Sequence, residues 1–335
     1  MGRSVLEAVL ALATSAALAA CASGTASSPV TVDSPTPSAS SRPASSPTRT
    51  PTHQPTRTPT RTPTRASSSP TSAPAHPTKV LVFMVENHSL AEMQSQMPWT
   101  FSVAQHYGYA TSYHAITHPS LPNYLAIAGG STYGVQDDNN PSSHPIPGPS
   151  VFGRALATGH TAGLYAEAMP GSCVATPAGE YAVKHNPWAY FTAERAACGK
   201  YDVPLTGFGA AVRSGSLPDA GMVIADMCHI GHDCPLSTTD AWLRSVVGPV
   251  LAGPDFTSGR LVVVITADED DQSAGNTVLT VVASKDMPTH QVVSTPLTHY
   301  SLSRLYAEVL GFTPLHAAAT APSLAQAFHL SVPGT

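Results

Sequence analysis

Charged residues are scarce in this sequence. Only 11% of its 335 residues are charged, the formal net charge is -5, and 42% of the residues are hydrophobic. A low charged fraction beside this hydrophobic content is typical of a globular domain with an extensive core. The part of the chain after residue 78 carries no excess of basic residues, so we expect no nucleic-acid partner.

Long apolar runs are missing beyond the first residues, and none there reaches the ~18 residues that a membrane-spanning helix needs. Residues 1–21 indicate an export signal, because Arg3 precedes an apolar segment that ends in Leu18-Ala19-Ala20-Cys21. This ending resembles the lipobox of bacterial lipoproteins, whose cysteine is acylated. We therefore expect an extracytoplasmic protein with Cys21 as its lipid anchor. The alternatives are an ordinary secretory signal and an uncleaved apolar anchor.

Cysteine is also rare, with five in the chain. Setting the lipidation candidate aside leaves an even four, which suits two disulfides in an oxidising compartment. Four cysteines allow three pairings, and proximity in sequence favours Cys173–Cys198 and Cys228–Cys234. A metal site that includes the two histidines between the last two cysteines is the alternative.

Proline, by contrast, is abundant, and most of its excess precedes Lys79. Residues 22–78 consist mainly of Ser, Thr, Pro and Ala, with almost no large apolar side chains. Such a segment cannot offset its own ordering entropy. We expect a disordered linker over 22–78 and one folded domain over 79–335.

Short apolar runs alternate with helical segments in the predicted domain. The predicted buried strands are Val80–Val85, Met222–Ala225, Leu261–Ile265 and Val278–Ala283. The predicted helices are Leu121–Ala128, Val151–Ala157, Ala241–Leu251 and Ser301–Leu310. This alternation predicts an α/β fold with a mainly parallel sheet, in which sites form beyond the carboxyl ends of the strands.

Acidic residues follow two of the predicted strands. Glu86 and Asn87 come directly after the first, and Asp268-Glu269-Asp270-Asp271 lies just beyond the third. Carboxylates gathered in this way repel one another unless a cation separates them, and hard oxygen ligands are what a divalent metal requires. The alternatives are a helix cap for Glu86 and a solvated acidic turn for the second group. Two acidic clusters at two strand ends favour the metal site.

Ser120 lies in the proline-bracketed turn His118-Pro119-Ser120-Leu121-Pro122-Asn123, just before a predicted helix. Near a helix N-terminus a serine is often a cap, but free backbone N–H groups there also bind anions. Coordination to the predicted metal would activate Ser120 as a nucleophile. The other candidates are histidines in polar turns: His185, His232 and His299.

Six short motifs occur in an order that resembles the bacterial phosphoesterase family. They are Glu86-Asn87-His88-Ser89, His118-Pro119-Ser120-Leu121-Pro122-Asn123-Tyr124, Lys184-His185-Asn186-Pro187, His232-Asp233-Cys234, Asp268-Glu269-Asp270-Asp271 and His299-Tyr300-Ser301-Leu302. That family includes secreted acid phosphatases and phosphatidylinositol-3-phosphate phosphatase, with phospholipases C as distant members. The resemblance implies an alkaline-phosphatase-like fold with helices on both faces of the sheet.

The resemblance also implies roles for individual residues. Ser120 would be the nucleophile, and three histidines would bind phosphate or transfer protons: His118, His185 and His232. The metal ligands, for a divalent ion of open identity, would be Glu86, Asn87, Asp268, Glu269 and His299. Asn123, Lys184 and Asp138 would bind the substrate.

One position departs from the family pattern. Where relatives usually carry an acid in the segment around Cys228, this chain has Ile230, which can neither ligate a metal nor accept a hydrogen bond. Asp226 could substitute for that acid, or this half of the site is altered.

The expected activity is hydrolysis of phosphomonoesters, including phospholipid-derived ones, by a metal-dependent acid phosphatase with a phosphoserine intermediate. Two alternatives remain open. One is a phospholipase C-type phosphodiesterase, and the other is a non-catalytic surface lipoprotein that binds phosphate or metal.

Overall fold

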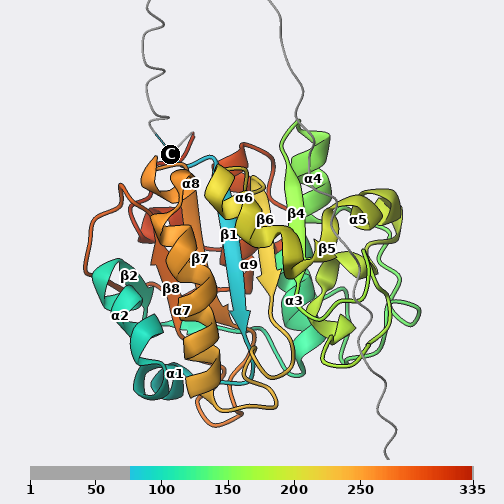
Figure 1. Cartoon of the computed structure of the whole chain (residues 1–335), viewed down its shortest axis with the longest axis horizontal. Helices are drawn as coiled ribbons and strands as arrows, with labels where there is room; N and C mark the ends of the chain where they lie inside the picture. Colours follow the sequence, from blue (N-terminus) through green and yellow to red (C-terminus); the bar gives the residue numbers. More distant parts are fainter. Residues whose placement is uncertain (1–75, 334–335) are drawn as a thin grey trace, which may run out of the picture. The chain divides into compact units, whose positions relative to one another are not determined.

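An eight-stranded sheet forms the middle layer of the protein, seen in a computed structural model that describes residues 76–333 (Figure 1). Its strand order is β5-β4-β6-β1-β7-β8-β2-β9. The strands are β1 Lys79–Val85, β2 Gly108–Ala110, β4 Ala162–Ala166, β5 Asp202–Pro204, β6 Ala220–Ile224, β7 Leu261–Ala267, β8 Thr280–Ala283 and β9 Gln291–Val293. Only β8 runs antiparallel to its neighbours, β7 and β2. The predicted mainly parallel α/β fold is confirmed.

Helices cover both faces of this sheet. Figure 1 shows α6 (Phe208–Ser214), α7 (Leu236–Ala252) and α8 (Pro254–Thr257) in front of the strands and α9 (His299–Leu310) behind them. On the front side α7 also contacts α1 (Leu90–Gln96) and α2 (Pro98–His106). Helix α9 in turn contacts α3 (Ser120–Gly129), α4 (Val151–Ala157) and α10 (Leu324–Ala327).

The remaining elements are short. A separate two-stranded parallel sheet joins β3 (Tyr113–His114) to β10 (Leu297–Thr298). Helix α5 (Arg195–Tyr201) packs against β5. Five short 3-10 helices complete the described chain: η1 Val183–His185, η2 Pro187–Tyr190, η3 Thr192–Glu194, η4 Leu205–Gly207 and η5 His316–Ala319.

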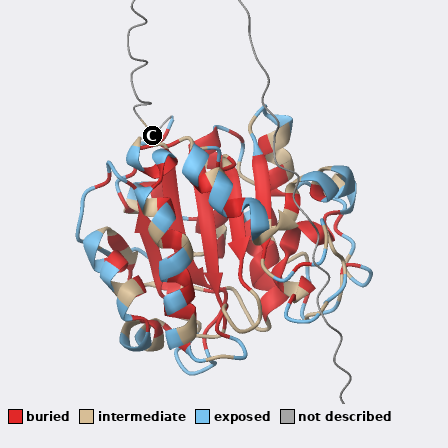
Figure 2. Cartoon of the chain, viewed as in Figure 1, coloured by how far each residue is buried: buried red, intermediate tan, exposed pale blue. Residues whose placement is uncertain are grey.

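The core lies on both faces of the central strands, where every residue of β1, β6, β7 and β8 is buried (Figure 2). These strands are rich in valine and isoleucine, which fit a pleated surface covered on both sides. Burying both faces explains why they appear in the sequence as continuous apolar runs rather than as alternating patterns. The same runs bring Glu86 and Asp268 to one edge of the sheet.

Two helices begin two or more residues earlier than predicted. Helix α7 starts at Leu236 rather than at Ala241, because its first turn is polar and hides the apolar period. Helix α9 starts at His299 because Thr298 and Ser301 form a capping box. The second shift places His299 inside the helix, where its ring is buried.

Both predicted disulfides are present, Cys173–Cys198 and Cys228–Cys234. The first joins the loop after β4 to α5, and the second closes a small loop after β6. The predicted signal segment, Cys21 and nearly all of the predicted linker lie outside the described residues. Within residues 76–333, no helix combines the length and apolarity that crossing a bilayer requires.

We expect the free energy of unfolding to depend on pH because of the buried carboxyl of Asp202. Burial raises the pKa of its carboxyl to about 7, although a hydrogen bond from Asn186 Nδ2 (2.8 Å) opposes this shift. The native state therefore holds a proton that the unfolded state releases near pH 4, so the contribution of Asp202 to stability falls as pH rises from about 4 to about 7. We expect Asp202→Asn to remove this loss.

Urea unfolding at pH 5 and pH 8 measures the effect. The advantage of Asp202→Asn over the wild type should be larger at pH 8, by on the order of 2–4 kcal/mol. The control is Asp286→Asn, at a highly exposed carboxylate. Its unfolding free energy should differ from that of the wild type by the same amount at both pH values. An equal advantage of Asp202→Asn at both pH values would contradict the prediction.

Candidate active site

Two buried strands deliver their acidic residues to one point at the carboxyl edge of the sheet. Strands β1 and β7 are paired in parallel, with Val85 opposite Ala267, so Glu86 and Asp268 emerge side by side. Asp268 N–H donates to the Val85 carbonyl (3.0 Å), and Asn87 N–H donates to Asp268 Oδ1 (3.1 Å). The helix cap considered for Glu86 is supplied instead by Ser89, whose side chain accepts from Glu92 N–H.

Ser120 is the first residue of α3, and its side chain does not cap that helix. The N-cap position is held by Pro119, which has no side-chain cap. The Ser120 hydroxyl instead donates to Glu86 Oε1 at 2.7 Å. The backbone N–H of Leu121, in the first turn of α3, donates to Asp138 Oδ1 (2.9 Å). Asp138 therefore accepts the hydrogen bond that an N-cap side chain would otherwise accept. Ser120 is thus aimed at the acidic centre.

Lys184 and His185, from η1, place two basic groups on the same carboxylate. Lys184 Nζ lies 3.0 Å from Glu86 Oε1, 3.3 Å from Asp138 Oδ2 and 3.5 Å from Ser120 Oγ. His185 Nε2 lies 2.6 Å from Glu86 Oε1, and its ring stacks on Tyr124 with the centroids 5.2 Å apart. Burial alone would raise the pKa of Glu86, but His185, Lys184 and the Ser120 hydroxyl together lower it below its usual value. Glu86 is therefore held as a carboxylate.

The pKa values of the neighbouring acids, Asp268 and Glu269, shift in the opposite direction. Burial raises the pKa of Asp268 well above its usual value, and the charges of Glu86 and Glu269 raise it further. Burial also raises the pKa of Glu269 to about 7, with His118 opposing the shift and Glu86 adding to it. Glu86 Oε2 and Asp268 Oδ2 are buried and have no hydrogen-bond partner among the described residues. Unpartnered carboxylate oxygens in a buried acidic centre fit a divalent cation.

His118 and Asn123 border this centre and hold Glu269. His118 Nδ1 lies 3.3 Å from Glu269 Oε2, and its Nε2 lies 3.2 Å from Asp270 Oδ1. Asn123 Nδ2 donates to Glu269 Oε2 (3.1 Å) and to the Thr117 carbonyl (2.7 Å). The side-chain amide predicted to bind substrate is thus engaged in ordering the turn that carries Ser120, whereas His118 is only partly covered.

His299 and His232 lie in very different surroundings. His299 Nε2 lies 2.6 Å from the Asp268 carbonyl oxygen, and its Nδ1 lies 3.1 Å from Tyr113 Oη. Both ring nitrogens therefore face protein groups, and His299 contacts the backbone of Asp268. Burial lowers the pKa of His299 to about 4. His232 pairs with the exposed Asp233 (2.6 Å), and no contact in the described chain joins it to Ser120.

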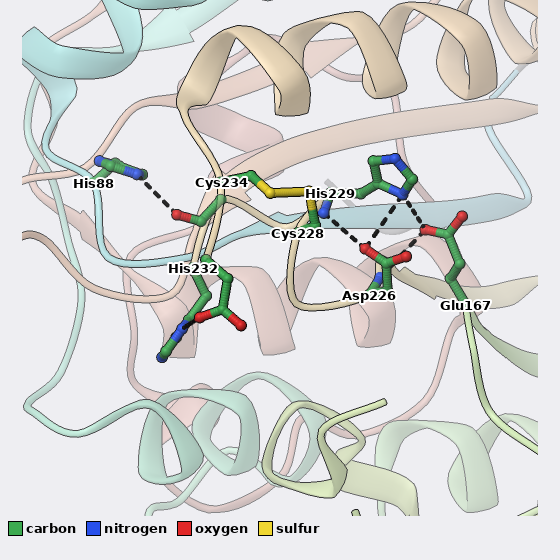
Figure 3. Close-up of a disulfide and its surroundings, with 9 residues drawn as sticks. His88, Glu167, Asp226, Cys228, His229, His232 and Cys234 are labelled. Atoms are coloured by element: carbon green, nitrogen blue, oxygen red, sulfur yellow. Dashed lines mark hydrogen bonds and ion pairs between the residues drawn. A yellow bond between two sulfur atoms is a disulfide. The ribbon is translucent and has the colours of Figure 1, made fainter. Parts of the chain in front are cut away.

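Ile230 is a core residue, fully buried, and its carbonyl accepts from Glu86 N–H (3.0 Å). The backbone of Ile230 therefore helps to position Glu86, which accepts the hydrogen bond from the Ser120 hydroxyl. Asp226, considered as a substitute for the missing acid, bonds instead to His229 N–H (2.7 Å) beside Glu167 (Figure 3). No sequence pattern indicated Tyr113 as part of the site, because it has the character of an ordinary core residue, and Tyr124 was included only as the last residue of the Ser120 motif.

This sheet, with a serine and carboxylates at its carboxyl edge, places the protein in the alkaline-phosphatase-like fold class. A protein of the alkaline phosphatase superfamily from Vibrio parahaemolyticus has the same fold, with a TM-score of 0.53 at 11% identity over 79% of this chain and 77% of that one. The lipoteichoic acid synthase LtaP from Listeria monocytogenes gives a TM-score of 0.50 at 9% identity, over 76% of this chain and 79% of that one.

The sequence profile of the Phosphoesterase family matches residues 88–305, and the chain belongs to that family. A phosphatidylinositol-3-phosphatase of Mycobacterium tuberculosis is 30% identical over 73% of this chain and 81% of its own length. A phosphate-repressible acid phosphatase of Penicillium chrysogenum is 29% identical over 57% of this chain, which spans about half (49%) of that enzyme. The protein is therefore a hydrolase that acts on phosphoric ester bonds.

Proposed function

We propose that the chain is an exported, metal-dependent acid phosphatase that hydrolyses phosphomonoesters through a phosphoserine at Ser120. One observation carries the proposal: the Ser120 hydroxyl lies 2.7 Å from Glu86 Oε1 in a buried acidic centre, with Lys184 Nζ 3.5 Å from its oxygen. A nucleophile beside a cation and a cluster of unpartnered carboxylate oxygens suits phosphoryl transfer. The relatives named as phosphatases support a monoester substrate.

Glu86, Asn87, Asp268 and Glu269 would hold the metal. Oxygen donors of this kind suit Ca²⁺, Mg²⁺, Mn²⁺ or Fe²⁺, and Zn²⁺ also accepts carboxylates. When bound, the ion would lower the pKa of the Ser120 hydroxyl and neutralise charge on the phosphoryl oxygens. His299 would act through the Asp268 backbone, and its position argues for orientation of that ligand.

The chain's own groups account for the proton and charge movements. Ser120 Oγ attacks phosphorus while its proton passes along the hydrogen bond to Glu86. The ester P–O bond breaks, and the leaving alkoxide takes a proton from His118. Lys184, anchored by Asp138 and Glu86, stabilises the charge on the non-bridging oxygens. Water, losing a proton to His118, then attacks phosphorus; the bond between phosphorus and Ser120 Oγ breaks, phosphate leaves, and Glu86 returns its proton to Ser120 Oγ.

His118 also marks the side from which substrate would enter. Its side chain is 31% exposed, whereas Ser120 is buried. A cavity of about 350 Å³ adjoins it, lined by His118, Asp270, Gln272, Gly275 and Asn276. A leaving group placed there would meet His118 Nε2 before it reached bulk water. This arrangement supports His118 rather than His232 as the proton donor.

The proposed location is outside the cytoplasm. Two disulfides in a chain of this size are typical of an oxidising compartment. A lipid on Cys21 would hold the enzyme at a membrane, where a phospholipid-derived monoester would be within reach. The relative named as a phosphatidylinositol-3-phosphatase supports this substrate class.

The test compares p-nitrophenyl phosphate with bis(p-nitrophenyl) phosphate before and after removal of metal. We expect turnover of the monoester, its loss on treatment with a chelator, and its recovery when a divalent cation is returned. Turnover of the diester alone would identify the phospholipase C-type alternative. If neither ester is hydrolysed in any metal, the alternative of a non-catalytic binding protein holds.

A further inference from the structure

A second group of metal-ligating side chains lies apart from the Ser120 centre. Glu167 directly follows β4, Asp226 follows β6, and His229 lies in the loop that the Cys228–Cys234 disulfide closes (Figure 3). Strands β4 and β6 are paired in parallel, which brings Glu167 and Asp226 to the same edge of the sheet. Glu167 Oε2 accepts from Asp226 N–H (3.3 Å), Asp226 Oδ1 accepts from His229 N–H (2.7 Å), and His229 Nδ1 pairs with Glu167 Oε2. Among the described contacts, none joins these side chains to the Ser120 centre.

The two carboxylates converge on one ring nitrogen of His229. His229 Nδ1 lies 3.0 Å from Glu167 Oε2 and 3.2 Å from Asp226 Oδ1, and all three ligand atoms lie within 4.8 Å of one another. Two ligands of a tetrahedral zinc ion, each ~2.0–2.1 Å from the metal, are about 3.3 Å apart. The nitrogen–oxygen separations are therefore those of ligands that share one ion. A single proton on Nδ1 can satisfy only one of the two carboxylates well.

The charge of this group also calls for a cation. No lysine or arginine in residues 76–333 pairs with either Glu167 or Asp226, so only His229 is available to balance two carboxylates. The side chains are each partly exposed, which leaves room for water to complete a coordination shell.

The group is held in place before any ion arrives. The disulfide restrains the loop, and the His229 ring stacks on Trp242 of α7 with the centroids 5.9 Å apart. Asp226 Oδ1 accepts from His229 N–H, and Glu167 N–H donates to the Ile224 carbonyl (2.9 Å). A preformed set of ligands loses little conformational entropy on binding.

We propose that Glu167, Asp226 and His229 form a second divalent-cation site, which binds Zn²⁺ or Mn²⁺ through Glu167 Oε2, Asp226 Oδ1 and His229 Nδ1. One imidazole with two carboxylates suits these ions better than Mg²⁺ or Ca²⁺, which prefer oxygen ligands alone. Bound there, the ion ties the ends of β4 and β6 to the disulfide loop, whose Ile230 carbonyl holds Glu86. The site does not depend on the phosphatase activity proposed for Ser120.

The test counts ions bound to the full chain. Metal-free protein with intact disulfides is equilibrated with Zn²⁺, and bound zinc is measured per chain for the wild type, Asp226→Asn, His229→Gln and His160→Gln. His160 is the matched control, because it lies 3.8 Å from a carboxylate oxygen of Asp219 and its side chain is 33% exposed, against 35% for His229. Circular dichroism without metal shows whether each variant is folded.

We expect the wild type and His160→Gln to bind one more equivalent of zinc than Asp226→Asn and His229→Gln, or to bind that equivalent at least ~10-fold more tightly. Equal binding by all four proteins overturns the proposal and leaves His229 as an ion-pair partner only. Failure of the Ser120 centre to bind metal would lower the count in every protein alike, so the two failures are distinguishable.

Should either variant fail to fold, diffraction from wild-type crystals at the zinc absorption edge replaces the comparison. An anomalous peak among Glu167, Asp226 and His229 supports the site. A peak confined to the Glu86–Asp268 centre contradicts it.

Discussion

Replacing Ser120 with alanine is expected to lower kcat for p-nitrophenyl phosphate by about 10³-fold or more, because the proposed reaction has no other nucleophile. The substitution removes a hydroxyl that donates to Glu86 Oε1, and that oxygen keeps His185 and Lys184 as partners. The fold should therefore survive. Substrate affinity should change far less than kcat, since Lys184 remains to bind phosphate.

Ser303→Ala is the matched control. Ser303 is equally buried, lies on α9, and its hydroxyl has no partner among the described residues, so its loss should leave turnover unchanged. Mass spectrometry of acid-quenched wild-type enzyme should find one phosphoryl group on the peptide that contains Ser120, and none in Ser120→Ala. Full activity in Ser120→Ala would remove the central claim of the proposed mechanism.

The sequence predicted the parts of the fold whose signal is local. Strands β1, β6 and β7 are continuous apolar runs because both of their faces are buried, and such runs stand out in a sequence. Strand β4 was missed because two of its five residues are alanine and one is glycine, which are weak strand formers. Strands β2, β5 and β9 have only three residues each and are held by pairing with distant neighbours.

The residues of the candidate site also differ in how far the sequence alone predicts them. Glu86, Asp268 and Glu269 were found because the ends of parallel strands meet at one edge, which is a rule of the fold. The bond of Lys184 and His185 to Glu86 depends on how a long loop after β4 returns to the sheet, and no local pattern encodes that path. The sequence marked His185 only as a histidine in a polar turn, and the resemblance to a family supplied the roles of both residues.

Ile230 and His299 show what the structure adds to a motif. In the sequence Ile230 is a lost acid, but in the structure its side chain fills the core and its carbonyl holds Glu86. His299 follows a motif expected to supply a metal ligand, yet both of its nitrogens contact Asp268 and Tyr113. A sequence shows which atoms a side chain carries, and only the packing around it shows which direction they face.

The second large effect is expected from Asp268→Asn, which should abolish metal-dependent turnover while stabilising the metal-free protein. Asparagine keeps an oxygen to accept from Asn87 and Glu269 N–H, and it replaces the unpartnered Asp268 Oδ2 with a donor. It also removes one of three neighbouring carboxylates whose mutual repulsion contributes to the raised pKa of Asp268. Without metal, we expect the variant to gain about 1–3 kcal/mol of unfolding free energy.

With metal the order should reverse, because the variant lacks the charge that the cation would balance. A wild type saturated at 1,000 times its dissociation constant gains about 4.1 kcal/mol, which exceeds the advantage of the metal-free variant, and Asp268→Asn should gain almost none of it. Thermal unfolding with chelator and with excess divalent cation measures both signs in one experiment, with Asp286→Asn as a control that should follow the wild type. If metal-free Asp268→Asn is less stable than the wild type, the hydrogen bonds of Asp268 stabilise the metal-free fold more than its buried charge destabilises it. That result would contradict the prediction.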